Sequence, residues 1–229
     1  MKKSLFLIVI LINTTNFCIS QNWGNVNVFF YNQEPSDYAL QIFNKVLASS
    51  DYEGPDITLK ANYYIPNAMA ISEPIFQAVW NGYIMVNQFN GYKRYMLYNP
   101  NFMTQIQFGC GNEFVALSIF AHELGHHKYN HCDNSQDPWL VFKHPWQKEW
   151  ESDYYSGFIL AKLGADSSDL QISQRLMFSM WGSLTHPNTV TRIQKISEGY
   201  RDGGGIDNIQ TGLMNIYKQI MNDFTKWHQ

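Results

Sequence analysis

"FAHELGHHKYNHC", from Phe120 to Cys132, contains four of the seven histidines in this 229-residue chain. On a helix, residues four positions apart lie about 40° apart around the axis. His122 and His126 can therefore hold one metal ion from the same face. Glu123 lies one step further round, where its carboxylate can contact a water on that ion without binding the ion itself. This is the HExxH arrangement, in which two histidines bind zinc and the glutamate acts as a general base.

The other two histidines of this stretch do not share that face. On a helix His127 lies about 100° away from the ligand face, so we expect it to be exposed or to pair with a neighbour. His131 lies beyond the expected helix end near Asn130, and we expect it to have a structural role. The stretch therefore predicts two metal ligands and not four.

A catalytic zinc ion needs a third protein ligand and an open position for water. Glu149 is the strongest candidate, because "EWESD" places Glu149 and Asp153 one turn apart on the next expected helix. Glu149 can bind the ion while Asp153 accepts a hydrogen bond from a ligand imidazole. Glu151 points about 200° away from Glu149, so we expect it to be solvated. Without a metal, the segment would be an ordinary acidic first turn. The other candidates for the third ligand are His131, Cys132, His144, Glu151 and His186.

Three segments in a fixed order connect the chain to a known family. "AHELGHHKYNH", "EWESD" and "HPNTVTRI", which span roughly Tyr95 to Gly199, resemble the gluzincin zinc peptidases of metallopeptidase family 48. That family includes the HtpX-type heat-shock proteases and the CAAX-type endoproteases. The resemblance implies a zincin-like catalytic domain with one Zn²⁺ per chain. The residues it implies are His122, His126 and Glu149 as ligands, Glu123 as base and Asp153 as support for a ligand.

The third segment adds two further residues by the same resemblance. It implies that His186 donates a hydrogen bond to the tetrahedral oxyanion and that Arg192 braces the acidic helix. A solvated histidine in a loop before a helix is the alternative reading of His186. The chain departs from the membrane members of the family by lacking their transmembrane helices, and it carries Ser152 where alanine is usual.

The order of the elements predicts an α+β fold. We expect a helix over Ser36–Ser50 and a strand within 54–71. Two more strands within 82–100 would surround a hairpin turn at Asn90-Gly91. We therefore expect a small antiparallel sheet, in which "RYMLYNPNF" (94–102) offers an edge strand to an extended peptide. Mainly helical structure follows, with helices expected over about 112–130, 147–163, 167–184, 186–205 and 206–227.

The first twenty residues have the layout of a secretory signal peptide. A basic start precedes the apolar run Leu5–Ile12, which is too short to cross a bilayer. We expect cleavage near Ser20 and an exported protein, periplasmic or secreted. A lipid anchor at Cys18 is disfavoured, because Phe17 lies where such a signal needs a small residue. Residues 1–20 are thus expected to be the signal peptide and 21–229 a single metallopeptidase domain.

Charge and cysteine content narrow the class of protein further. The chain has 16 Lys and Arg against 19 Asp and Glu, with no basic run, so nucleic acid is not expected as a partner. No later apolar run is long enough to be a transmembrane segment in the mature chain. Cys110 and Cys132 flank an expected helix about 28 Å long. A disulfide needs Cα atoms within about 7 Å, so we expect two free thiols.

Three functions are compatible with these patterns. The first is a zinc-dependent endopeptidase that acts on peptides or unfolded proteins, with Glu123 as the base. The second is a non-catalytic, zinc-stabilised module that binds peptides on a peptidase scaffold. The third is an exported metal-sequestering protein that uses the clustered histidines. Metal content separates the last, because a peptidase binds one zinc tightly and a store binds two or more. The sequence does not indicate the oligomeric state.

Overall fold

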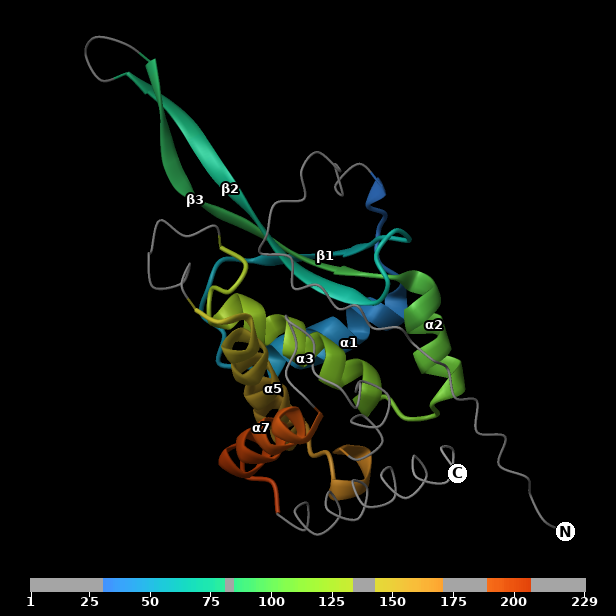
Figure 1. The fold of residues 1–229 in the computed structure, drawn as a ribbon. Coiled ribbons are helices and arrows are strands. Elements are labelled where there is room, and N and C mark those ends of the chain that lie inside the picture. Colours follow the sequence, from blue (N-terminus) through green and yellow to red (C-terminus); the bar gives the residue numbers. More distant parts are fainter. Residues whose placement is uncertain (1–30, 81–84, 134–142, 171–188, 207–229) are drawn as a thin grey trace, which may run out of the picture.

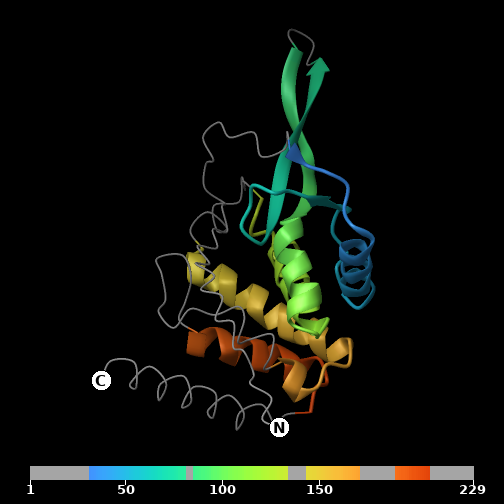
Figure 2. The same cartoon turned by 90° about the vertical axis from the view of Figure 1, so that its right-hand side faces the viewer.

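The fold is a sheet laid over a stack of helices, and the computed structural model describes residues 31–80, 85–133, 143–170 and 189–206. Its elements in chain order are α1 (Asp37–Ala48), β1 (Ile57–Ala61), β2 (Ala68–Trp80), β3 (Met85–Tyr98), α2 (Pro100–Gly109), α3 (Phe114–Lys128), α5 (Pro145–Lys162) and α7 (Thr189–Asp202). Helix α3 lies beneath the sheet, α5 packs against α3, and α7 packs against the far side of α5 (Figures 1 and 2). The α+β class predicted from the sequence is confirmed.

The sheet is mixed, with the strand order β1-β3-β2. Strand β2 pairs antiparallel with β3, whereas β1 runs parallel to β3, from Ile57 opposite Arg94 to Ala61 opposite Tyr98. The expectation of a purely antiparallel sheet is wrong for β1. The reason is that β1 and β2 run in opposite directions at the two edges of the sheet. Strand β3 inserts between them antiparallel to β2, and it is therefore parallel to β1.

The predicted hairpin turn at Asn90-Gly91 is wrong, because both residues lie inside β3. Pro74 pairs with Tyr92 and Phe76 pairs with Phe89, so two residues of β3 face one residue of β2. This is a β-bulge, and the φ of Gly91 is +94°. Asn-Gly favours a positive φ, and here a bulge uses it in place of a turn. The two strands stay paired as far as Trp80 and Met85.

The segment 94–102 is not an edge strand either. Arg94–Tyr98 is the only part of β3 that pairs with strands on both sides, so it is the centre of the sheet. Asn99 then caps helix α2, which the sequence reading missed, by accepting from the backbone N–H groups of Asn101 and Phe102. Pro100 occupies the first turn of α2, where a missing N–H has no cost. The exposed edge of the sheet nearest α3 is β2.

The outer parts of β2 and β3 form an arm, residues 74–80 and 85–92, which projects away from the helices (Figure 1). Phe76 and Met85 are 58% and 60% exposed. The ring of Phe89 contacts those of Phe76 and Tyr92, with centroids 6.1 and 5.0 Å apart. The sequence contains no charged residue between Glu73 and Lys93. The arm is therefore a two-stranded, uncharged and partly aromatic extension.

Helix α3 is buried along almost its whole length. It lies between the sheet on one side and α5 on the other, with α1 beside it (Figure 2). The rings of Phe43 and Tyr98 meet Phe120 of α3 edge to face, at 6.5 and 5.9 Å. This burial removes the two histidines of the HExxH segment from water. A buried imidazole without a polar partner costs free energy of folding, so both rings need partners. Helix α1 begins at its cap Ser36 as predicted.

Glycines allow α3, α5 and α7 to approach closely. A Cβ at Gly125 would lie 2.8 Å from the Cα of Ser152, and one at Gly157 would lie 1.9 Å from the carbonyl oxygen of Ile196. A Cβ at Gly199 would lie 1.8 Å from the carbonyl oxygen of Tyr154. These contacts set the distance at which side chains of the three helices meet.

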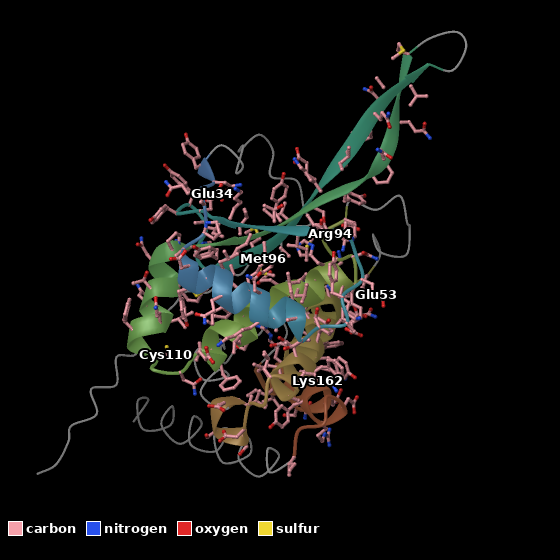
Figure 3. The ribbon with its side chains drawn as sticks, turned by 180° about the vertical axis from the view of Figure 1, so that it is seen from behind. Glu34, Glu53, Arg94, Met96, Cys110 and Lys162 are labelled. Carbon is pink, nitrogen blue, oxygen red and sulfur yellow. The ribbon has the colours of Figure 1, made fainter. Side chains whose placement is uncertain are left out.

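The remaining predictions concern individual segments. Helices α5 and α7 agree with the expected 147–163 and 186–205, and Gly164 ends the former with a φ of +79°. Most of the helix expected at 167–184, the one at 206–227 and the signal peptide lie outside the described residues. Among the helices that the structure does describe, none has the length and apolar character to cross a membrane. Cys110, at the end of α2 (Figure 3), and Cys132 are both free thiols, as predicted.

Candidate metal centre

Three buried side chains converge between α3 and α5. His122 and His126 project from successive turns of α3, and Glu149 projects from α5. The two Nε2 atoms lie 3.2 Å apart, His122 Nε2 lies 3.5 Å from Glu149 Oε2, and His126 Nε2 lies 3.5 Å from Glu149 Oε1. Each residue offers one ligand atom to the same point. The structure therefore brings together the three residues that the sequence proposed as ligands.

The size and chemistry of this triangle fit a zinc ion. Ligand bonds of 2.0–2.1 Å in a tetrahedral site place neighbouring ligand atoms about 3.3 Å apart. The two Nε2 atoms meet that spacing at 3.2 Å, and each lies 3.5 Å from a different oxygen of Glu149, so that one ligand atom from each residue lies within 4.8 Å of the others. Two imidazoles and one carboxylate are also the ligand set of zinc sites that keep a fourth position open. The residues present are thus suited to hold zinc.

A buried ion pair supports the first histidine. His122 Nδ1 lies 3.0 Å from Asp153 Oδ1. Arg192 of α7 donates to both oxygens of Asp153, from Nε at 2.7 Å and from an Nη at 2.8 Å. Arg192 also lies 3.6 Å from Glu149 Oε2. The guanidinium therefore offsets the two buried carboxylates that face the ligand histidines.

These contacts shift the pKa values of the centre. Burial opposes the charged form of His122, yet its contacts with Asp153 and Glu149 raise the pKa of its ring to about 10. Burial likewise opposes ionisation of Glu149, but His122, His126 and Arg192 hold the pKa of Glu149 well below its usual range. The pKa of Asp153 is lowered for the same reason, chiefly by Arg192 against the effect of burial. A cation is favoured at this point, whether it is a proton or a metal ion.

Glu123 lies beside the triangle and is not one of its corners. Its Oε2 accepts a hydrogen bond of 2.8 Å from the backbone N–H of Ala70 in β2. Burial raises the pKa of Glu123 to about 7, with the charge of His122 acting in the opposite direction. No sequence signal indicated Ala70, because the contact depends on the packing of β2 over α3.

The turn after α3 reverses the chain and places His131 beside His126 of that helix. Asn130 has a φ of +58°. The backbone N–H of His131 donates to the His126 carbonyl at 2.8 Å, and that of Asn130 donates to the His127 carbonyl at 3.2 Å. This pair of bonds is a Schellman motif, in which asparagine tolerates the left-handed conformation. Asn130 is the sequence signal that places His131 close to His126.

Arg94 of β3, labelled in Figure 3, holds this turn in place. Its guanidinium donates to the His127 carbonyl at 2.7 Å, to Asn130 Oδ1 at 2.6 Å and to Asp133 Oδ2 at 2.7 Å. The turn is therefore tied to the central strand of the sheet. That anchoring fixes the position of His131 relative to α3.

The expectation for His127 is met by one of its two alternatives, and the expectation for Glu151 is wrong. His127 is not exposed, although it does pair with a neighbour, because its Nε2 lies 2.9 Å from the Tyr95 carbonyl. Burial lowers the pKa of His127 to about 3. Glu151 is not a free solvated carboxylate, because its Oε2 lies 2.6 Å from His131 Nε2 and also contacts Lys143 Nζ. Glu151 does point away from Glu149 on α5, but the turn after α3 brings His131 to that side of the helix.

The structure gathers most of the proposed site residues at one place. His122, Glu123, His126, Glu149, Asp153 and Arg192 all lie there, whereas His186 lies outside the described residues. Within the described part of the chain, His122, His126 and Glu149 are the only group arranged to hold a metal ion. Comparison of the chain with protein-family models, with curated proteins and with solved structures gave no match.

Proposed function

We propose that this chain is a zinc-dependent endopeptidase that hydrolyses peptide bonds in peptides or unfolded proteins. The observation that carries the proposal is the position of Glu123, beside a His-His-Glu triangle but not part of it. A structural zinc site has no use for such a carboxylate. A general base must lie close to the ion without binding it, and Glu123 follows the ligand His122 in α3 with its carboxylate held by the N–H of Ala70.

Each side chain has a role in the proposed reaction. Bound zinc would lower the pKa of a water and polarise the scissile carbonyl. Glu123 accepts the proton of that water and passes it to the leaving amine. Asp153 orients His122, and Arg192 balances the charge of Asp153. His186 would donate to the oxyanion, a role that rests on the family resemblance alone.

The edge of β2 supports a peptide as the substrate. The N–H of Ala70 donates to Glu123, and the carbonyl of Ala70 accepts from the Cys132 thiol at 3.2 Å. Both backbone groups of Ala70 therefore point away from β3 and toward the centre. Because these contacts occupy both groups, an extended peptide that adds to this edge would pair with the residues of β2 beyond Ala70 and pass close to Glu123.

The rival functions are less well supported by the same contacts. A metal store would need the other two clustered histidines as ligands. His127 contacts the Tyr95 carbonyl, and His131 contacts both His126 and Glu151. Both rings are thus held by protein groups. A zinc-stabilised binding module remains as the second candidate, and it differs from the peptidase only in making no use of Glu123.

We also propose that the protein is exported. The proposal rests on the basic start and apolar run of residues 1–20. Mass analysis of the protein recovered from the exported fraction tests it, and the expected product begins near Gln21. Retention of the whole N-terminal segment in the cytoplasm would contradict export.

Substitution of the base tests the function directly. The purified chain from Gln21 should bind one zinc and cleave casein or another unfolded protein. Glu123→Gln should keep the zinc, as measured by metal analysis, and lose cleavage, because the amide cannot accept the water proton. His126→Ala should lose both. Normal cleavage by Glu123→Gln would contradict the catalytic assignment, and no cleavage by the wild-type chain would favour the binding module.

A further inference from the structure

The Nδ1 atom of the second ligand histidine faces another histidine, whereas that of the first faces a carboxylate. His126 Nδ1 lies 3.0 Å from His131 Nδ1, and both rings are almost completely buried. A histidine that binds zinc through Nε2 carries its proton on Nδ1, and that proton needs an acceptor. Carboxylates, backbone carbonyls and waters usually fill this role. Here an imidazole nitrogen lies at the hydrogen-bonding distance.

The other side of His131 determines the direction of this hydrogen bond. His131 Nε2 lies 2.6 Å from Glu151 Oε2. An ionised carboxylate can only accept, so the proton of the neutral ring is on Nε2 and its Nδ1 has a lone pair. His126 must then donate from Nδ1, which leaves its own Nε2 lone pair directed at Glu149 and the proposed zinc. Lys143 contacts the same oxygen of Glu151 and keeps that carboxylate in place.

His131 is also held independently of any metal. The Schellman turn and Arg94 fix its backbone, the ring of Tyr129 stacks on it at 5.7 Å with an interplanar angle of 26°, and Ser152 Oγ lies 3.5 Å from its Nδ1. A ring that is fixed by its surroundings can fix its partner in turn. The two ligand histidines are therefore supported differently, His122 by Asp153 and His126 by His131.

From this geometry we infer that His131 and Glu151 are positioning residues of the proposed zinc centre. Glu151 holds the tautomer of His131, and His131 holds the tautomer and ring orientation of His126. The inference rests on the metal site of the proposed function, and it adds two residues that contact neither the metal nor a substrate. Loss of such support typically weakens metal binding by about 10–100-fold.

Zinc affinity and the spectrum of a cobalt-substituted protein test this role without using activity. The chain from Gln21 would be titrated with zinc against a chelator of known affinity. His131→Leu should weaken zinc binding about 10–100-fold and change the visible absorption of the Co²⁺ form. His131→Asn should restore most of the affinity, because the side-chain oxygen of asparagine can accept the His126 proton. Glu151→Leu should resemble His131→Leu, and Glu151→Gln should be milder.

His127→Leu is the matched control. His127 is as deeply buried as His131 and lies beside His126, but its contact is with the Tyr95 carbonyl. His127→Leu should change the thermal midpoint of the protein and leave zinc affinity within about twofold of wild type. A purely structural role of His131 would give the same result for His131→Leu.

The failures of the two proposals can be told apart. Wild-type zinc affinity in both His131→Leu and Glu151→Leu would overturn the positioning role and leave the peptidase intact. Failure of His131→Asn to improve on His131→Leu would also overturn it. If the His131 variants do not fold, the two Glu151 variants decide the matter in the same way. Failure of the wild-type chain to bind zinc would overturn the metal centre itself, and with it this inference.

Discussion

The backbone N–H of Ala70 in β2 donates a hydrogen bond to the carboxylate of Glu123 in α3, at 2.8 Å, across 53 residues of sequence. Ala70 therefore turns its N–H away from its neighbour in the sheet, Met96 of β3. One strand thus borders the centre with its open edge and holds the proposed base at the same time. The position of Glu123 depends on the sheet as well as on its own helix.

Removal of that N–H should impair catalysis without displacing zinc. In Ala70→Pro the donor to Glu123 is lost, whereas the pairing of β2 with β3 is kept because this N–H points to the open edge. We expect kcat for a peptide substrate to fall about tenfold or more while zinc content stays at wild type. Ser72→Pro is the control, since Ser72 lies two residues further along the same strand. It should raise KM and leave kcat close to wild type.

Removal of the Glu149 carboxylate should make the thermal midpoint of the chain independent of zinc. A bound ion stabilises the folded state in proportion to the logarithm of its excess over the dissociation constant, by about 2.7 kcal/mol at a hundredfold excess. A chelator should therefore lower the thermal midpoint of the wild-type chain. In Glu149→Ala the chelator should have no effect. A full response of Glu149→Ala to the chelator would show that another residue completes the site.

Removing one partner of the Asp153–Arg192 ion pair should lower the free energy of unfolding far more than replacing both partners. Arg192→Met leaves a buried carboxylate without its cation, and we expect a loss of about 3–5 kcal/mol in the free energy of unfolding. Asp153→Leu combined with Arg192→Met should recover much of that stability. The double variant should still bind zinc more weakly than wild type, because the carboxylate beside His122 Nδ1 has been removed. Denaturant unfolding and zinc titration measure the two effects separately.

The close approach of α5 and α7 should not tolerate a single methyl group. In Gly157→Ala the new Cβ would collide with the Ile196 carbonyl, and we expect a loss of about 3 kcal/mol or more together with weaker zinc binding. Gly109→Ala is the matched control in another helix, because a Cβ there meets no atom within 4 Å. Since Gly109 is the last residue of α2, the substitution should leave the free energy of unfolding unchanged or raise it by up to about 1 kcal/mol. Equal stability of the two variants would contradict the helix packing described here.

The two cysteines should both react in the denatured, unreduced protein. Cys110 and Cys132 are free and lie beyond opposite ends of α3. Thiol titration of the chain from Gln21 should give about two groups per molecule. A count near zero in a monomer would mean that the two residues are bridged and that α3 is shorter than 15 residues.

Local spacing was enough to predict the parts of the site that lie on one helix. His122, Glu123 and His126 are arranged as the helical period requires, and so are Glu149 and Asp153. The approach of α5 to α3 is a tertiary contact through Gly125 and Ser152, and only the family resemblance indicates it in advance. Contacts that cross between elements, such as Ala70 with Glu123, have no local signal at all.

The predictions for Asn90-Gly91 and Glu151 are wrong for the same reason, namely contacts between elements that are far apart in the sequence. Asn90-Gly91 favours a positive φ, but pairing with β2 decides whether that φ is used in a turn or in a bulge. Glu151 was placed correctly on its helix and assigned to solvent, because the helical wheel contains no information about the turn that carries His131. A polar residue facing away from the metal was in this case facing another part of the protein.

The arm has a consequence for the behaviour of the protein in solution. Among the described residues no strand pairs with either outer edge of the arm. The arm carries aromatic side chains, and the sequence has no charge between Glu73 and Lys93 to repel another copy. Natural proteins usually protect such edges with lysines, prolines, bulges or a covering element, because bare edges nucleate aggregation, and of these the described arm has Pro74 and the bulge at Asn90-Gly91. We therefore expect the arm to limit the solubility of the folded chain.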